Sequence, residues 1–182
     1  MKTIKFLGLL ILTAIVSGNT FAQIKMVGGA AMYPTKNIVE NAVNSKDHTT
    51  LVAAVKAAGL VPTLESAGPF TVFAPTNEAF DALPAGTVST LLKPENKAKL
   101  TSILTYHVVP GKLSSEDLKK MVKMHNGKAT LKTVEGGSLY VSMKGKHLMI
   151  TDENGNSSLV TIADVNQSNG VIHVVNKVLL PK

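Results

Sequence analysis

The order of two hydrophobic periodicities constrains the fold of this chain more than any other feature. In residues 38–58 apolar residues recur at helical spacing, and in residues 138–143 they alternate with polar residues as in a half-buried strand. Helical patterns come early in the chain and strand patterns come late. A sheet of alternating strands and helices would mix the two throughout, so this order predicts an α+β domain.

Turn and cap residues predict where several elements begin and end. Asp47 is placed to cap a helix that Gly59 would end, because aspartate accepts hydrogen bonds from free helical N–H groups and glycine adopts left-handed backbone. Residues 106–111 predict a short strand closed by Pro-Gly, and residues 178–180 predict a last strand. No internal repeat and no low-complexity linker separates these elements, so we expect one domain.

Residues 1–22 have the features of a secretory signal peptide. Lys2 and Lys5 give a basic start, and the apolar run of residues 6–16 follows. This run is shorter than the roughly 20 apolar residues that a membrane-spanning helix needs. We therefore expect cleavage after the small residue Ala22 and a secreted or periplasmic protein with no stable membrane span, rather than a buried N-terminal helix.

The rest of the chain divides into a short lead-in and a domain. Residues 23–35 are mostly small and are expected to be a flexible lead-in, and residues 36–182 are expected to form a single domain. The chain has no cysteine, so packing and hydrogen bonds alone must hold the domain together. An exported domain without disulfides fits a bacterial export route better than a eukaryotic one.

The charged residues argue against a nucleic-acid partner. All 19 basic residues are lysines, 12 residues are acidic, and aromatic residues make up only 4% of the chain. Nucleic-acid sites usually rely on arginine forks and stacked aromatic rings. We interpret the lysines as a scattered, solvated surface, with mild attraction to an anionic polysaccharide or membrane as the alternative.

The sequence carries no recognisable catalytic or metal-binding motif. There is no thiol nucleophile, and no Gly-x-Ser-x-Gly turn presents a serine. The histidines never fall in a His-x-x-x-His window; they are His48, His107, His125, His147 and His173. We expect no enzyme, no cofactor and no metal, and we expect His173 to be a partly buried strand residue that makes one hydrogen bond. A spatial pair of His107 and His173 is the alternative that spacing leaves open.

We interpret the stretch "GPFTVFAPTNEAF" as a structural segment rather than a binding site. Residues 70–74 are strand-like, Pro75 ends the ladder because it lacks an N–H, and Thr76 is a candidate helix N-cap. Phe70 and Phe80 are assigned to packing rather than to a partner. We therefore expect substitutions in this stretch to act through stability.

Several separated motifs resemble the fasciclin domain family. "GPFTVFAPTNEAF" (68–80) and "NGVIHVVNKVLLP" (169–181) are similar to its two signature boxes, and "LTYHVVPGKL" (104–113) is similar to its central Tyr-His motif. "HTTLVAAVKAAGL" (48–60) resembles its opening helices, and the match runs in family order over residues 36–181. The resemblance implies a wedge of mostly antiparallel β-strands flanked by several short helices. Its structural signature would be Phe70, Phe73, Pro75, Thr76, Phe80, Asn169, Gly170 and His173.

The resemblance also implies a function. It implies a secreted cell-adhesion or extracellular-matrix interaction module whose partner is an extracellular protein or polysaccharide, with no cofactor and no catalysis. In animal relatives integrin binding is attributed partly to the Tyr-His region, which makes Tyr106 and His107 our candidates for interaction. An integrin ligand is not implied here. The alternative for this pair is that the tyrosine packs and the histidine is hydrogen-bonded, which would lock a helix-to-strand junction.

Two other function classes remain open. An extracytoplasmic small-ligand or lipid-binding domain would use an adaptable apolar groove lined by methionines such as Met121, Met124, Met143 and Met149. A hydrolase would need a serine or aspartate within hydrogen-bond reach of His107 or His173, in an open pocket.

Overall fold

A computed structural model describes residues 24–182. The helices are α1 (Ile38–Ala42), the 3-10 helix η1 (Lys46–His48), α2 (Thr49–Ala58), α3 (Val61–Glu65), α4 (Asn77–Asp81), α5 (Thr87–Leu91), the 3-10 helix η2 (Pro94–Asn96), α6 (Lys97–Tyr106) and α7 (Ser115–Met124). The strands are β1 (Lys25–Val27), β2 (Ala30–Met32), β3 (Phe70–Pro75), β4 (Val108–Pro110), β5 (Lys128–Lys132), β6 (Ser138–Lys144), β7 (His147–Thr151), β8 (Ser157–Gln167) and β9 (Gly170–Val175). Within these residues no helix is both long and apolar enough to cross a membrane.

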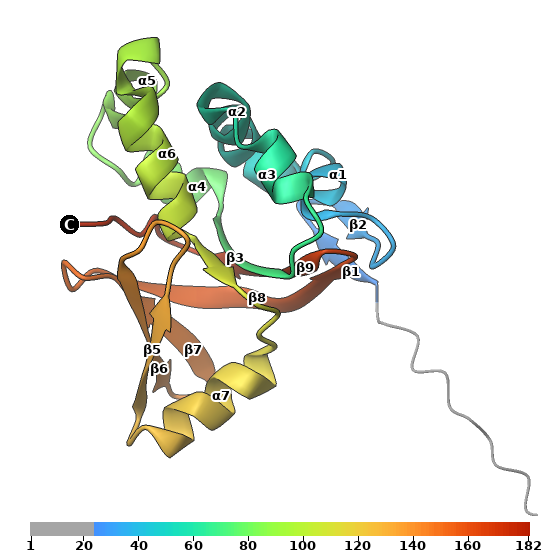
Figure 1. The fold of residues 1–182 in the computed structure, drawn as a ribbon, viewed down its shortest axis with the longest axis vertical. Coiled ribbons are helices and arrows are strands. Elements are labelled where there is room, and N and C mark those ends of the chain that lie inside the picture. Colours follow the sequence, from blue (N-terminus) through green and yellow to red (C-terminus); the bar gives the residue numbers. More distant parts are fainter. Residues whose placement is uncertain (1–23) are drawn as a thin grey trace, which may run out of the picture.

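Seven of these strands form one sheet in the order β4-β3-β9-β8-β7-β6-β5. Helices α1 to α6 lie on one side of the central strands, and α7 with β5 to β7 lies on the other, so the molecule is a wedge (Figure 1). Every neighbouring pair in this sheet is antiparallel except β3 and β9. The predicted α+β class and the wedge of mostly antiparallel strands flanked by short helices are confirmed.

The parallel pair β3–β9 lies between β4 and β8 in the sheet. Its register runs from Phe70 opposite Gly170 to Pro75 opposite Val175. The two sequence boxes, about a hundred positions apart, are therefore neighbours in space. All six residues of β9 are buried, since the sheet is covered on both faces at this point.

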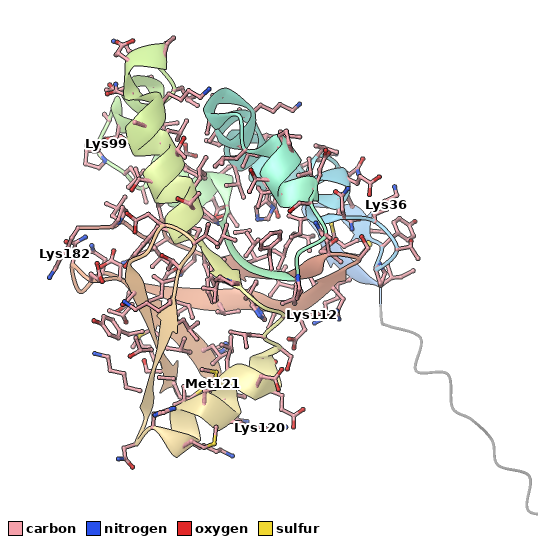
Figure 2. All side chains as sticks on the ribbon, in the orientation of Figure 1. Lys36, Lys99, Lys112, Lys120, Met121 and Lys182 are labelled. Atoms are coloured by element: carbon pink, nitrogen blue, oxygen red, sulfur yellow. The ribbon has the colours of Figure 1, made fainter. Side chains whose placement is uncertain are left out.

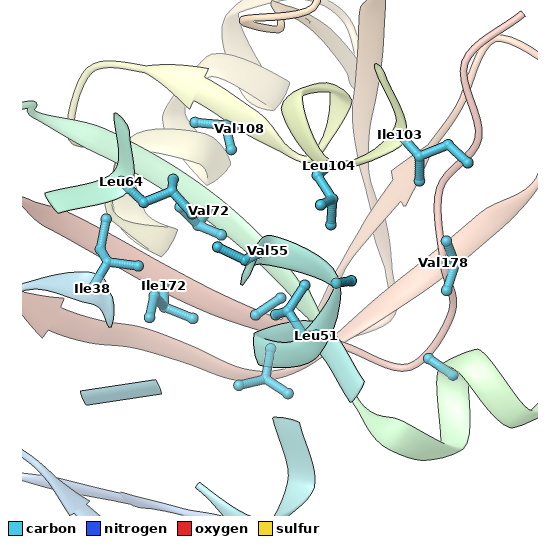
Figure 3. Packing of buried hydrophobic residues seen from close by; sticks show 14 of the residues in the cluster. Ile38, Leu51, Val55, Leu64, Val72, Ile103, Leu104, Val108, Ile172 and Val178 are labelled. Carbon is cyan, nitrogen blue, oxygen red and sulfur yellow. The ribbon is translucent and has the colours of Figure 1, made fainter. Parts of the chain in front are cut away.

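The two faces of the central strands belong to two cores. The first core lies under the helical half and contains Ile38, Leu51, Val55, Leu64, Val72, Leu104 and Ile172 (Figure 3). The second core lies between α7 and strands β5 to β8 and contains Leu118, Val122, Leu131, Leu139, Val141 and Ile150. In β3 the alternation sends Val72 into the first core and Phe73 into the second, because successive strand side chains point to opposite faces.

Helix ends follow local chemistry, with one error in our predictions. Gly59 ends α2 in the left-handed region with φ of 74°, and the Leu60 N–H donates to the Val55 carbonyl at 3.0 Å, which completes a Schellman motif. The predicted cap by Asp47 is wrong. Asp47 lies inside η1, and α2 starts after His48 without a side-chain cap.

The chain termini and the Tyr-His segment differ from prediction in three places. The flexible lead-in is wrong for residues 25–32, because β1 and β2 pair as a hairpin and bury Val27 and Met32. The strand predicted over residues 106–111 begins only at Val108. Residues 178–180 form no strand, although two of them are buried in the cores. The predicted signal peptide lies outside the described residues.

Candidate functional site

The predicted interaction pair lies at the junction between α6 and β4. Tyr106 is the last residue of α6, His107 is its C-cap, and β4 begins at the next residue. The two side chains are 0% and 3% exposed, respectively. Neither side chain reaches the surface, so a role in binding would have to act through the position of the surrounding surface.

The Tyr106 hydroxyl connects two strand ends. It donates to the Ser138 carbonyl at 2.7 Å and accepts the Glu153 N–H at 3.1 Å. A Cβ on Gly137 would lie 2.7 Å from the ring, so the glycine leaves room for the tyrosine. Burial raises the pKa of Tyr106 to about 12, so the hydroxyl keeps its proton and remains a donor.

The His107 ring connects α6 to the C-terminal segment. Nδ1 lies 2.8 Å from the Ile103 carbonyl, and Nε2 accepts the Leu179 N–H at 3.0 Å. This pattern requires a neutral ring with its proton on Nδ1. Burial lowers the pKa of His107 to about 4, against smaller opposing effects of the Ile103 carbonyl and Asp152.

His173 makes a second connection of the same kind. Nε2 lies 2.8 Å from the Leu113 carbonyl, and Nδ1 accepts the Asp164 N–H at 3.2 Å. Its ring stacks on Phe73 with centroids 5.8 Å apart, and burial lowers its pKa. The histidine therefore makes two hydrogen bonds rather than the one that we predicted, and it is fully buried.

Ser115, Asp164 and His173 lie near one another without forming a catalytic relay. The Asp164 carboxylate accepts the Ser115 N–H at 2.6 Å and its hydroxyl at 2.5 Å. Burial acts to raise the pKa of Asp164, but the Ser115 hydrogen bonds together with the charges of His173 and Lys25 outweigh it, and the pKa is lowered. The histidine meets only the Asp164 backbone, whereas a relay needs it between the serine and the carboxylate. The contacts instead attach the start of α7 to β8.

Asn169 ties the helical half to the β8–β9 turn. Its Oδ1 accepts the Ile38 N–H at 3.0 Å, and its Nδ2 donates to the Leu64 and Ser66 carbonyls at 2.7 and 2.9 Å. Only 6% of the side chain surface is exposed. The amide thus satisfies three backbone groups that would otherwise be buried without partners.

The structure brings the three motifs of the sequence together. The Phe73 N–H donates to the His107 carbonyl at 2.9 Å, and Phe73 lies opposite His173 in the parallel register. Phe80 is buried in α4, and the Thr76 hydroxyl caps α4 by accepting the Ala79 N–H at 3.3 Å. His107 and His173 do not bind each other, because both nitrogens of each ring bind other groups.

Asp152 is a polar centre that sequence reasoning missed. This carboxylate is 1% exposed and accepts the N–H groups of Asn154, Asn156 and Leu180 at 2.9 to 3.0 Å. It shapes the β7–β8 turn and holds the C-terminal segment against it. The spacing Asp-x-Asn-Gly-Asn was the available signal, since aspartate at the start of a turn binds backbone N–H groups further on.

The helical half contains a partly open apolar cavity of about 80 Å³, lined by residues such as Leu51, Val55 and Leu64. At its wall Ser45 Oγ lies 2.8 Å from His48 Nδ1, and both residues are 3% exposed. The four methionines that the ligand-binding alternative would place in a groove do not line this cavity. Within residues 24–182 no cluster of three histidine, aspartate or glutamate side chains could hold a metal ion.

These features define a class of protein: a disulfide-free wedge in which buried polar side chains join distant backbone segments. The family model for the fasciclin domain matches residues 46–181. The chain therefore belongs to the fasciclin domain family, as the resemblance predicted.

Individual relatives agree with this assignment. The chain is 48% identical over 156 residues to protein sll1483 of Synechocystis, covering 86% of this chain and 79% of that protein. It is 39% identical to immunogenic protein MPB70 of Mycobacterium bovis, covering 77% of this chain and 66% of that protein. It is 42% identical to the transforming growth factor-beta-induced protein ig-h3 of Sus scrofa, covering 72% of this chain but only 17% of that longer protein. A solved FAS1 domain pair from the insect cell adhesion molecule fasciclin I shares the fold, with a TM-score of 0.71, 20% identity, and coverage of 80% of this chain and 51% of that one.

Proposed function

We propose that this protein is a secreted adhesion module that binds a component of the extracellular matrix or cell surface. The observation that carries the proposal is the fasciclin family match over residues 46–181, which includes the whole seven-stranded sheet and its buried connections. The insect molecule with the same fold is described as a cell adhesion molecule. Export through the predicted signal peptide, with cleavage after Ala22, is part of the proposal.

We infer a non-enzymatic role. A hydrolase would use His107 or His173. In each of these rings both nitrogens are hydrogen-bonded to backbone groups. Ser45 and His48 contact each other, but both are 3% exposed and line an apolar cavity of about 80 Å³, so neither side chain is presented to solvent. The structural role of these rings supports an interaction module without cofactor or metal.

The small-ligand and lipid-binding alternative has less support. The apolar cavity of about 80 Å³ is far below the roughly 300 Å³ of typical ligand pockets. A larger hollow of about 520 Å³, lined by residues of α5, α6 and Leu180, is open to solvent. Ligand pockets bury most of their ligand, so an open hollow is a poor lipid site.

The test combines binding with a deletion. The purified mature protein is expected to bind matrix prepared from the cells that produce it, and a strain lacking the gene is expected to attach less and to form a weaker biofilm. Matrix stripped of protein and matrix stripped of polysaccharide would show which component is bound. The proposal would be refuted if the deletion strain attached normally and the purified protein did not bind the matrix.

A further inference from the structure

The net positive charge of the described chain comes from one segment. Residues 112–147 contain eight lysines and three acidic residues, whereas residues 24–111 and 148–182 together contain nine of each. The segment forms α7, β5, β6 and the turn into β7, which lie together at one end of the wedge (Figure 1). Figure 2 shows Lys120 at this end, well away from Lys36 and Lys99, whereas Lys112 lies nearer the middle of the molecule. The lysines are therefore less scattered in space than the sequence indicated.

The sheet at this end has one covered and one open face. Inward side chains such as Leu131 and Val141 pack with Leu118 of α7 in the second core. Apart from the buried Ser138, the outward side chains of β5 and β6 are exposed or half-buried, and α7 packs on the inward face of these strands. We call this open surface the basic sheet face; it is formed by Lys128, Thr130, Lys132, Tyr140, Ser142 and Lys144.

The lysines of the basic sheet face have no carboxylate partners. Lys128 Nζ lies over the Tyr140 ring at 4.2 Å, and Lys132 Nζ donates to the Ser138 hydroxyl at 3.0 Å. Within residues 24–182, the one ion pair closer than 4.0 Å joins Lys120 and Glu116 on α7. These ammonium groups are therefore held in place by neutral neighbours and remain available to an external anion.

We propose that the basic sheet face binds an acidic polysaccharide. This inference rests on the proposed function and names the partner class and the surface. Lys128 and Lys132 are four residues apart on one strand, about 13 Å at the rise of an extended chain. A polymer with regularly repeated acidic groups can meet both lysines, and a third at Lys144 on the next strand. The Thr130 and Ser142 hydroxyls and the Tyr140 ring supply hydrogen bonds and an apolar platform for sugar rings.

Other anionic partners fit this face less well. A protein that binds a membrane surface inserts large apolar side chains, and none of the large hydrophobic residues exposed in residues 24–182 belongs to this face. A protein partner would need a recess for an anchoring side chain, and the two hollows described above lie in the helical half. Nucleic acid would favour arginine, which the chain lacks.

The test measures binding of the purified protein to immobilised alginate, an acidic polyuronate. Neutral dextran and vesicles of phosphatidylcholine with about one quarter phosphatidylglycerol are the comparison probes. We expect binding to alginate that weakens as salt rises, because salt screens exposed charges, and little binding to dextran. Equal binding to dextran, or tighter binding to the vesicles than to alginate, would overturn the proposal.

Two matched triple variants locate the surface. Lys128→Gln/Lys132→Gln/Lys144→Gln is expected to weaken alginate binding about tenfold or more. Lys93→Gln/Lys97→Gln/Lys99→Gln removes the same charge from another exposed surface and is expected to change it by less than about twofold. All six lysines are exposed, so both variants should unfold at the temperature of the wild type. Equal losses in the two variants would show that net charge, and not this face, attracts the polymer.

Native matrix separates failure of this inference from failure of the proposed function. If the wild type and the variant of the basic sheet face bind native matrix equally well, the proposed adhesion function is supported. The assignment of binding to the basic sheet face is then refuted. If the wild type binds alginate but no native matrix, the proposed function falls.

Discussion

At the scale of single residues, the buried polar side chains act as connectors between backbone segments. A neutral imidazole has one donor and one acceptor, so His107 and His173 can each satisfy one carbonyl and one N–H without burying a charge. Tyr106 and Asn169 make comparable links. The resemblance to fasciclin domains pointed to these four residues. Their contacts show that polar side chains able to bind two backbone groups each hold distant segments of the fold together.

Tyr106→Phe tests whether the tyrosine acts through structure. The change keeps the ring but leaves the Ser138 carbonyl and the Glu153 N–H without their partner, and an unsatisfied buried group costs about 1–3 kcal/mol. We expect that loss in the free energy of unfolding, measured by urea denaturation, with matrix binding retained at temperatures where the variant is folded. Loss of binding with unchanged stability would instead assign the hydroxyl a role in contact.

Phe73→Ala and Thr76→Ala compare a core residue with a cap. Phe73 is 0% exposed in the second core, so its truncation should cost about 3–5 kcal/mol of unfolding free energy. Thr76→Ala removes the cap of α4 and should cost about 1 kcal/mol. Thermal and urea unfolding would measure both. An unchanged melting temperature for Phe73→Ala would contradict its assignment to the core.

At the scale of elements, local residue types explain where helices end, whereas the strand order of the sheet depends on pairing between distant segments. The left-handed Gly59 stops α2 as its residue type predicts. Asp47 does not cap α2, because Asp47 lies in the 3-10 helix η1 and α2 begins one residue later than an Asp47 cap implies. The parallel pair β3–β9 had no local signal, since parallel neighbours are joined by long connections.

Gly170→Ala tests the parallel pair. A Cβ at this position would lie 2.1 Å from the Phe70 carbonyl oxygen, and that atom belongs to backbone that cannot yield. We expect a loss of about 3 kcal/mol in unfolding free energy, at the upper end of overpacking effects. Gly155→Ala is the matched control: nothing lies within 4 Å of its Cβ, although its φ of 86° carries a strain of about 1 kcal/mol. A smaller loss for Gly170→Ala than for the control would contradict the close approach of β3 and β9.

At the scale of the whole molecule, stability should depend on pH through the buried histidines. His107 has a pKa of about 4 in the folded chain against 6.5 when exposed, so the unfolded chain binds more protons between these values. The stability is fully present above pH 6.5 and is lost as pH falls toward 4, by about 3 kcal/mol for this residue. Burial also lowers the pKa values of His48 and His173, which add in the same direction.

The measurement is the free energy of unfolding from pH 7 to pH 4.5. His107→Gln retains a donor and an acceptor but does not titrate, so it should reduce the slope by about one proton. A variant that folds and keeps the wild-type slope would show that His107 is not the titrating group.

The sequence by itself determined most element types, several helix boundaries and the family, because periodicity, caps and motif spacing are local properties of the chain. It named Tyr106 and His107 but left open whether they bind or pack. The tertiary structure decided that both are buried, that the boxes at residues 68–80 and 169–181 are parallel neighbours, and that the lysines of residues 112–147 gather at one end. These outcomes depend on which distant strands pair, and no single segment of the chain encodes that choice.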